Sequence, residues 1–286
     1  MTYSELYAQI SAQLASAGCE DAAFDAGCIV CDIGGLPRGI APALVDDTVS
    51  PEAQDAVYAA GAQRAAGRPL QYILGNWDFL MLNLYVGEGV LVPRPDTELL
   101  CETAAAYARR MGWDVCKALD LCSGTGCVGL GTAALLDGAV SVSVTAVEFS
   151  PEAEVYLHRN LEKYAQYPTR AVHADVLLGP PSDFVQGEYH LLLSNPPYIP
   201  SEDLPSLQRE VLREPRIALD GGDGYVFYRA IAQKWLSCLC KGGLCAVEVG
   251  VGQADTVAEL FAAAGLHDVH ALKDLGGIDR VVCGVK

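Results

Sequence analysis

Apolar residues recur at helical spacing through the first 75 residues of the chain, and glycines interrupt the pattern. The first apolar face consists of Tyr3, Leu6, Tyr7, Ile10 and Leu14. A second helix is expected to end near Gly34, and a third to run from Pro51 to Gly67 with Ser50 as its N-cap. The pattern predicts a small helical bundle over residues 1–75, and no motif within it indicates catalysis.

Residues 76–95 change from helical spacing to alternation between apolar and polar positions. The apolar positions are Trp77, Phe79, Leu82, Leu84, Val86, Val90 and Val92. Gly87 and Gly89 lie among them, and alternation around a glycine-rich turn is typical of a β-hairpin. We therefore expect a hairpin linker over residues 76–95, which ends in Pro93-Arg94-Pro95.

From Lys117 onward, short apolar runs alternate with longer amphipathic stretches. The runs expected as strands cover residues 118–121, 143–147, 171–174, 191–193 and 244–249. The stretches expected as helices cover residues 97–110, 128–136, 150–164, 225–239 and 254–264, before a terminal hairpin that runs to Val285. This order predicts an α/β fold, in which a mostly parallel sheet carries helices on both faces.

The strand expected at residues 191–193 stops abruptly at Asn195-Pro196-Pro197-Tyr198. Proline lacks an N–H group and restricts its neighbour, so the strand gives way to a stiff loop where open α/β sheets bind ligands. The side-chain oxygen of Asn195 and the main-chain carbonyl of Pro196 are two fixed acceptors. They suit the two hydrogens of a planar –NH2 group, with Tyr198 as a flat face beside them. Alone, however, so short a motif is equally compatible with an ordinary proline-rich turn.

Polar residues also follow the strands upstream of this loop. Residues 122–126 (Cys-Ser-Gly-Thr-Gly) join a strand to a helix, and their glycines allow a ligand to approach the main chain. Glu148 ends the next strand, where an acidic side chain can accept hydrogen bonds from ribose hydroxyls. Asp175 ends the strand after that. Together these positions indicate a site for an adenosine-bearing cofactor.

Three classes of cofactor compete for this loop. A P-loop is excluded because Gly-Lys-Ser/Thr is absent. The dinucleotide pattern G-x-G-x-x-G is formally present at Gly124, Gly126 and Gly129. Asp120, at the entry to the loop, would repel a pyrophosphate but would suit the charged amino group of S-adenosylmethionine. With the –NH2 acceptors of Asn195, this cofactor gives one coherent chemistry, methylation of nitrogen.

The charge and cysteine content narrow the partners and the compartment. A formal charge of −17 opposes a surface built for phosphate backbones and favours a small molecule or a basic protein partner, although it also promotes solubility. No apolar run is long enough to span a membrane and no signal peptide is evident, so we expect a cytoplasmic protein. The eleven cysteines are expected to be reduced thiols, and their spacing relative to the five histidines predicts no metal site.

Nearly the whole chain resembles the release factor glutamine methyltransferases of the HemK/PrmC family. The matching segments are residues 68–75, 91–98, 120–126, 195–199, 213–215 and 219–224. Asn-Pro-Pro-Tyr alone also occurs in DNA methyltransferases that act on amino groups. The blocks Pro93-Arg94-Pro95-Asp96-Thr97-Glu98 and Asp220-Gly221-Gly222-Asp223-Gly224 make the match specific.

The resemblance implies three parts and a division of labour. Residues 1–75 would form a helical substrate-recognition domain, residues 76–95 a β-hairpin linker, and residues 96–286 a Rossmann-like seven-stranded methyltransferase domain. The implied reaction is methylation by S-adenosylmethionine of the glutamine in the Gly-Gly-Gln motif of peptide chain release factors.

The resemblance also implies which residues of this chain form the site, position by position along the matching motifs. The cofactor would contact Asp120, Cys122, Ser123, Gly124, Thr125, Gly126, Glu148, Asp175, Val176 and Asn195. The substrate amide would contact Asn195, Pro196, Pro197 and Tyr198, with catalysis assigned to Asn195, Pro196 and Tyr198. Two positions depart from the usual pattern: Glu148 replaces a more frequent Asp, and Val176 stands where other members often carry an aromatic residue.

Two other functions are compatible with parts of this pattern. An adenine-N6 methyltransferase acting on nucleic acid would share the –NH2 acceptors, but it would need a basic cleft, which the net charge opposes. An inactive cofactor-binding scaffold would not require Asn195 or Tyr198. The sequence shows no general base near the Asn-Pro-Pro-Tyr motif.

Overall fold

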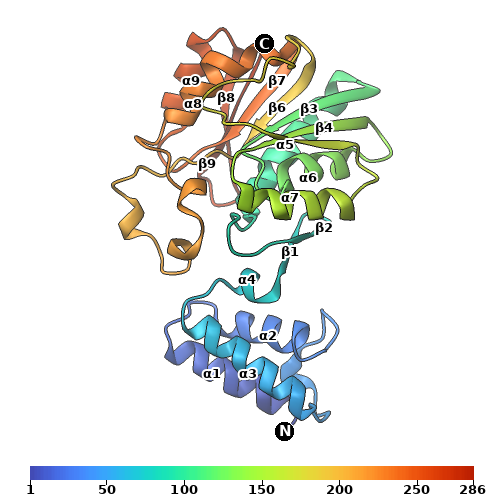
Figure 1. The fold of residues 1–286 in the computed structure, drawn as a ribbon, viewed down its shortest axis with the longest axis vertical. Helices are drawn as coiled ribbons and strands as arrows, with labels where there is room; N and C mark the ends of the chain where they lie inside the picture. The colour runs from blue at the N-terminus through green and yellow to red at the C-terminus, as the bar shows by residue number, and fades with distance from the viewer. The chain divides into compact units, whose positions relative to one another are not determined.

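The computed structural model describes all of residues 1–286. The chain divides into two compact units, neither of which is continuous in sequence. The N-terminal unit consists of Met1–Asn76 and Gln208–Arg213, and the sheet unit consists of Trp77–Leu207 and Glu214–Lys286. Figure 1 shows the helices of the first and the sheet of the second.

The N-terminal unit is helical, as its apolar spacing predicts. Its elements are α1 (Tyr3–Ser16), α2 (Ala22–Asp32), η1 (Pro42–Leu44), α3 (Pro51–Ala65) and α4 (Leu70–Leu74). Thr2 caps α1 in a capping box with Glu5, and Ser50 caps α3 by accepting a hydrogen bond from Ala53 N at 3.2 Å. These caps satisfy main-chain donors that would otherwise lack partners, so α1 and α3 each begin directly after their cap residue.

A short segment from far along the chain completes the N-terminal unit. Arg64 is almost fully buried and donates from Nε to Asp25 Oδ2 at 2.6 Å and from Nη1 to Glu210 Oε1 at 2.8 Å. Arg209 donates to the main-chain oxygen of Ala66 at 2.5 Å. A buried guanidinium needs paired acceptors, so the N-terminal unit depends on Glu210 as well as on its own helices.

The hairpin exists, but its turn lies elsewhere than the sequence predicts. The strands are β1 (Asn76–Phe79) and β2 (Leu82–Tyr85), and the turn is at Leu80, which adopts a φ of 51°. The glycine-rich stretch follows β2 instead of forming the turn. At Gly87 a Cβ atom would lie 2.2 Å from the hydroxyl oxygen of Tyr156, so this glycine permits close packing against α7 (Pro151–Lys163).

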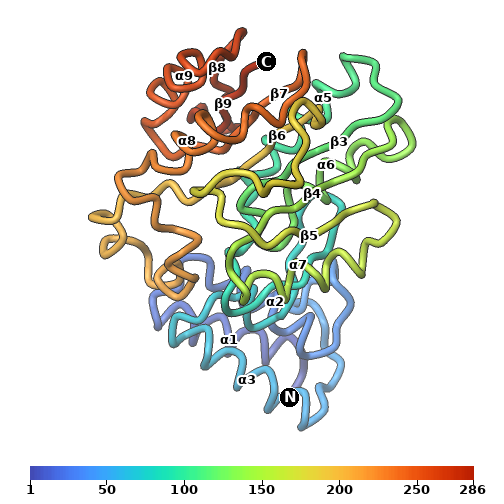
Figure 2. Tube along the Cα trace, turned by 45° about the horizontal axis from the view of Figure 1, so that its top comes forward, coloured from blue at the N-terminus to red at the C-terminus, as the bar shows by residue number.

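The sheet unit contains seven strands in the order β5-β4-β3-β6-β7-β9-β8. The strands are β3 (Val115–Leu121), β4 (Ser141–Glu148), β5 (Thr169–His173), β6 (Tyr189–Ser194), β7 (Leu239–Glu248), β8 (His267–Lys273) and β9 (Asp279–Val285). All neighbours are parallel except β9, which runs antiparallel to both β7 and β8. The predicted α/β fold with a mostly parallel sheet is therefore confirmed. Figure 2 traces its βαβ units from β3 through β4 to β5.

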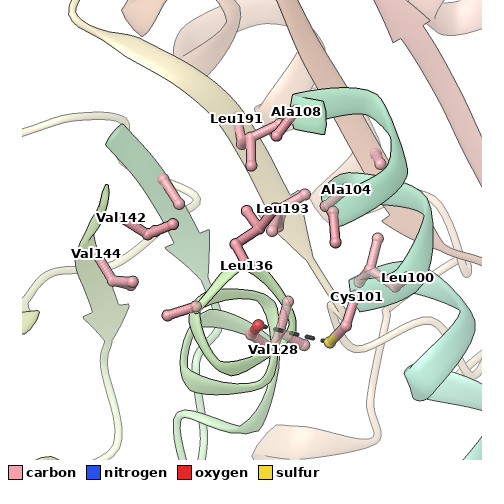
Figure 3. Close-up of a cluster of buried hydrophobic side chains, with 14 of the residues drawn as sticks. Leu100, Cys101, Ala104, Ala108, Val128, Leu136, Val142, Val144, Leu191 and Leu193 are labelled. Carbon is pink, nitrogen blue, oxygen red and sulfur yellow. Dashed lines mark hydrogen bonds between the residues drawn. The ribbon is translucent and has the colours of Figure 1, made fainter. Parts of the chain in front are cut away.

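Helices cover both faces of this sheet. One face packs against α5 (Glu98–Met111) and α6 (Cys127–Leu136), with part of α7. Figure 3 shows this core, where α5 and α6 meet side chains of β4 and β6 and the thiol of Cys101 donates to the main-chain oxygen of Val128 at 3.5 Å. The other face packs against α8 (Val226–Ala230) and α9 (Ala254–Ala263). Burial on both faces explains why the central strands are apolar throughout.

The single helix expected at residues 225–239 is broken into three short pieces. Beyond α8 the chain forms a π-helical turn, η6 (Ile231–Trp235), and then a 3-10 turn, η7 (Leu236–Cys238). The fully buried Trp235 donates from Nε1 to the main-chain oxygen of Val176 at 2.8 Å. Trp235 is the last residue of the π turn. Short 3-10 turns η2 (Pro95–Thr97), η3 (Leu204–Ser206), η4 (Val211–Arg213) and η5 (Arg216–Ala218) complete the chain.

Candidate functional site

The two loops singled out in the sequence lie side by side because of the strand order. β3 pairs with β4 on one side and with β6 on the other, and Leu121 is opposite Ser194. From β3 the chain continues to β4 and β5 on one side of the sheet, and it then crosses to β6 on the other side of β3. The topological switch therefore lies between β3 and β6. Parallel sheets bind ligands at such a switch, beyond the carboxyl ends of the strands.

The loop after β3 adopts a conformation that favours glycine. Gly124 has a φ of 54° and Gly126 a φ of 82°. A Cβ atom at Gly126 would lie 2.9 Å from Cδ1 of Leu157, so this position is restricted by packing as well. At Gly124 a Cβ atom would meet only Val90 Cγ2, at 3.7 Å, because this residue faces a pocket. The main chain at Gly124 is therefore open to a ligand.

This pocket has a volume of about 190 Å³ and lies entirely within the sheet unit. Predicted site residues in its lining are Cys122, Ser123, Gly124, Thr125, Glu148, Asp175, Val176, Asn195 and Pro197. The structure thus gathers nine predicted residues from four separate segments around one cavity. Asp120, Gly126, Pro196 and Tyr198 are not part of the lining.

The acidic side chains at the strand ends are held by the main chain. Glu148 Oε2 accepts a hydrogen bond from Gly124 N at 2.8 Å, and its Oε1 accepts from the amides of Phe149 and Ser150, both at 2.8 Å. Asp175 Oδ1 accepts from Leu177 N at 2.8 Å. Each carboxylate is oriented by these bonds and keeps acceptor capacity at the pocket.

Asp120 lies in β3, outside the pocket lining. It is fully buried, its Oδ2 accepts from Gly129 N at 2.9 Å, and its Oδ1 has no partner. Burial raises the pKa of this carboxyl to about 7. The side chain ties the glycine loop to α6, and its contact with a cofactor stays a prediction.

We expect Asp120 to make the folded state less stable at neutral pH than at acidic pH. Its pKa is higher in the folded protein than the ordinary 3.8, so folding takes up a proton between about pH 4 and 7 and the free energy of unfolding falls as pH rises through that window. Asp120→Asn keeps an acceptor for Gly129 N and removes the charge. At pH 8 it should be more stable than the wild type, by less than the ~4 kcal/mol that 1.36 kcal/mol per pKa unit gives, because its –NH2 group takes the buried place of Oδ1, which has no partner.

Urea unfolding at pH 5 and pH 8 would measure this difference. Burial also raises the pKa of Glu248 to about 7, so the variant should lose part of the pH dependence rather than all of it. Equal pH dependence in the two proteins would show that Asp120 does not titrate in this range.

The Asn-Pro-Pro-Tyr loop presents two acceptors that the protein leaves free. Asn195 donates from Nδ2 to Thr97 Oγ1 at 3.1 Å, while neither its Oδ1 nor the main-chain oxygen of Pro196 accepts a hydrogen bond from the protein. Tyr198 donates from its hydroxyl to Glu248 Oε1 at 3.3 Å. Burial and the neighbouring Glu248 raise the pKa of Tyr198, so its hydroxyl stays protonated. The free oxygens are those expected to hold an –NH2 group.

The loop is held from behind by the Asp-Gly-Gly-Asp-Gly block. Ile199 N donates to the main-chain oxygen of Leu219 at 3.1 Å, and Gly221 N donates back to that of Ile199 at 2.8 Å. Gln253 adds a bond from Nε2 to the main-chain oxygen of Tyr198 at 2.9 Å. The block has no side chain in the pocket lining, and it supports the Asn-Pro-Pro-Tyr loop through these main-chain bonds.

Several residues of the site escaped the sequence reasoning. Phe149, Ile217 and Phe227 line the pocket and add apolar surface to it, and Phe227 belongs to the same apolar cluster as Val176. Glu248 lies at the end of β7, in the same place on its strand as Glu148 on β4. The regular occurrence of acids at strand ends was the signal that could have identified it.

The sequence of this chain is similar to those of several known proteins. Residues 5–75 match the model of the PrmC N-terminal domain. A protein of Geobacter sulfurreducens named release factor glutamine methyltransferase is 39% identical over 95% of this chain and 92% of its own length. One of the same name from Bifidobacterium longum is 31% identical over the full length of both.

Structural comparison agrees with the fold. A methyltransferase structure from Pyrococcus furiosus shares 17% identity and a TM-score of 0.50, covering 82% of this chain and 97% of its own. None of the helices combines the length and apolar character needed to cross a membrane. The sequence identities extend over nearly the whole chain, and on that basis the chain belongs to the release factor glutamine methyltransferase family.

Proposed function

We propose that this protein transfers a methyl group from S-adenosylmethionine to the side-chain amide nitrogen of the glutamine in the Gly-Gly-Gln motif of peptide chain release factors. Family membership supports the substrate class. The observation that carries the chemistry is the pair of free acceptors, Asn195 Oδ1 and the Pro196 carbonyl, on a loop whose Asn195 and Pro197 line the pocket at the topological switch.

The residues of the pocket fit S-adenosylmethionine. Thr125 lines it with a buried hydroxyl that has no hydrogen-bond partner in the protein. Glu148 and Asp175 offer acceptors for hydroxyl and amino groups, and the open main chain at Gly124 leaves room beside them. The apolar residues Val176 and Phe227 suit a flat base. When bound, this cofactor supplies an electrophilic methyl group.

The residues around Asn195 can compensate for the low nucleophilicity of the amide nitrogen that receives the methyl group. An amide nitrogen is a poor nucleophile because its lone pair is delocalised into the carbonyl group. Asn195 Oδ1 and the Pro196 carbonyl would each accept one hydrogen of the –NH2 group, which orients the nitrogen and stabilises the positive charge it gains during transfer. The protonated Tyr198 would lie against the amide without adding a charge.

Release factor and a methyl-labelled cofactor would test this function directly. We expect one methyl group on the peptide that contains Gly-Gly-Gln, located by mass spectrometry, and none on a release factor whose motif glutamine is replaced by alanine. Transfer to DNA or RNA instead would favour the adenine-N6 alternative, because an exocyclic amine satisfies the same two acceptors. The net charge of −17 opposes that outcome.

We further propose that the N-terminal unit recognises the release factor and that the reaction takes place in the cytoplasm, where translation ends. The helices of that unit carry no candidate catalytic group, and the pocket lies entirely within the sheet unit. A protein substrate needs more contact area than the pocket offers, and a separate unit of about 75 residues can supply it.

Gly124→Ala should weaken binding of S-adenosylmethionine about tenfold or more, which corresponds to ~1.4 kcal/mol. The added methyl group would enter the pocket, since it meets only Val90 at 3.7 Å. Gly138→Ala is a matched control because Gly138 has a similarly positive φ of 73° but stands in open space outside the pocket. Calorimetric titration would compare the two variants. Equal affinities would remove Gly124 from the cofactor site.

A further inference from the structure

A chain of buried side-chain hydrogen bonds lies behind Asn195. Asn195 Nδ2 donates to Thr97 Oγ1 at 3.1 Å, and Thr97 Oγ1 donates to Glu248 Oε2 at 2.6 Å. The side chains of Thr97 and Glu248 are each about 1% exposed. The other carboxylate oxygen of Glu248 accepts from the hydroxyl of Tyr198 at 3.3 Å. One acid therefore contacts both polar side chains of the Asn-Pro-Pro-Tyr loop, directly or through one hydroxyl.

The chemistry of the acid sets the direction of this chain. An ionised carboxylate can only accept hydrogen bonds, so the Thr97 hydroxyl must donate its single proton to Glu248. The Thr97 oxygen can then only accept, and Asn195 must present its –NH2 group to it. The carbonyl oxygen of Asn195 is thereby turned to the opposite side, where it is free.

The opposite orientation of Asn195 would defeat the proposed reaction. A flipped amide would present its –NH2 group to the –NH2 group of the substrate, so two donors would face each other without an acceptor. The two orientations have nearly the same shape, and packing alone cannot distinguish them. Hydrogen bonding must therefore select one, and the bond to Thr97 is the hydrogen bond that the Asn195 side chain makes within the protein.

We propose that Glu248 is a positioning residue for methyl transfer, which acts through Thr97 to hold the carbonyl oxygen of Asn195 towards the substrate. The inference rests on the proposed function, because it assumes that Asn195 Oδ1 accepts a hydrogen of the substrate amide. Glu248 does not itself touch the substrate. Its bond to Tyr198 fixes the second polar side chain of the loop at the same time.

The surroundings of Glu248 connect this role to pH. Besides Thr97 and Tyr198, the ionisable groups around it are Asp96, Arg280, Tyr228 and Cys127. Burial raises the pKa of Glu248 to about 7, although the hydrogen bonds from Thr97 and Tyr198 lower it in part. The charge of Asp96 raises this pKa further, and the charge of Arg280 lowers it. Arg280 is itself paired with Asp96 at 3.2 Å and with Asp274 at 3.1 Å.

Protonation removes the constraint on Asn195. A neutral Glu248 carries an O–H group that can donate to Thr97, whose hydroxyl is then free to donate to Asn195 Oδ1. Both amide orientations become satisfied, and the free carbonyl oxygen is no longer guaranteed. Methyl transfer should therefore fall as pH decreases through about 7 and level off above it.

Thr97→Val, Thr97→Ser and Glu248→Gln would test this role by single-turnover transfer to release factor. Valine has the shape of threonine without the hydroxyl, and we expect it to slow transfer about tenfold to thirtyfold with little change in cofactor affinity. Serine restores the hydroxyl and should recover a rate within about threefold of the wild type. Glu248→Gln should lose the decline below pH 7, since glutamine does not titrate.

A double-mutant cycle separates positioning from a general structural effect. In an Asn195→Ala background, Thr97→Val should cost nothing further, because no amide remains to be oriented. Additive losses in the cycle would overturn the inference, as would a wild-type rate for Thr97→Val. If Thr97→Val does not fold, the pH profile of Glu248→Gln decides alone, and a profile equal to that of the wild type contradicts the proposal.

Failure of the inference is distinguishable from failure of the proposed function. A wild-type protein that methylates release factor while Thr97→Val does so equally fast would refute only the role of Glu248. A wild-type protein that transfers no methyl group to release factor would refute the function itself.

Discussion

Asn195→Ala is expected to slow methyl transfer to release factor about a hundredfold to a thousandfold, equivalent to ~2.7–4 kcal/mol, the loss seen when one positioned hydrogen bond is removed from a reacting centre. The side chain supplies one of only two free acceptors for the substrate amide. Cofactor affinity should change by less than about tenfold, or ~1.4 kcal/mol, because the glycine loop, Glu148 and Asp175 still line the pocket. Single-turnover transfer beside a cofactor titration measures both quantities.

Asn195→Asp is the informative companion to this variant. Aspartate keeps an acceptor towards the substrate but cannot donate to Thr97, and it adds a negative charge near Glu248. We therefore expect slow transfer here as well, although an acceptor is present. Near-normal turnover by Asn195→Ala would refute the two-acceptor mechanism, whereas near-normal turnover by Asn195→Asp alone would show that anchoring by Thr97 is dispensable.

A protein that begins at Trp77 is expected to bind S-adenosylmethionine normally but to methylate release factor with a kcat/KM reduced about a hundredfold or more, or ~2.7 kcal/mol. All residues of the pocket lie within the sheet unit, so its cofactor site is retained. The proposed recognition surface is lost with the helices of the N-terminal unit. Most of the effect should appear in KM, because the missing contacts are remote from the reacting atoms.

A short peptide containing Gly-Gly-Gln is the control for this truncation. It is too small to use a separate recognition unit, so the truncated and full-length proteins should methylate it at similar rates. Residues 208–213 remain in the truncated protein without their partners Arg64 and Ala66, and circular dichroism should establish that the sheet unit is folded. Normal turnover of intact release factor would overturn the assignment of recognition to the N-terminal unit.

Much of the sheet unit follows from local sequence patterns. Apolar runs of strand length and the longer stretches between them identify its parallel strands and the intervening helices, and polar residues at the strand ends identify the pocket. Glu148, Asp175 and Asn195 were found in this way, and the structure places them around one cavity. Such predictions succeed because the periodicity of a strand and the position of its end are local properties.

The features that were missed depend on distant contacts or on local competition. Thr97 donates a hydrogen bond to Glu248, which lies 151 positions further along the sequence, and no local pattern at either residue predicts this pairing. The hairpin turns at Leu80, which tolerates a positive φ, while Gly87 is needed for close packing against Tyr156. After Tyr225 the α-helix gives way to a π turn that ends at Trp235, whose indole bonds to the main chain of Val176. In each case tertiary packing outweighs the local preference.

The discontinuous N-terminal unit has a consequence for the order of events during synthesis. Its buried Arg64 pairs with Glu210, 146 positions further along the chain. A ribosome that has released only the first helices has not yet made this partner, and the guanidinium then has Asp25 as its sole carboxylate. Domains usually fold as they emerge, N-terminal first. Here we expect the first helices to mature late, when translation has passed Arg213 and most of the sheet strands already exist.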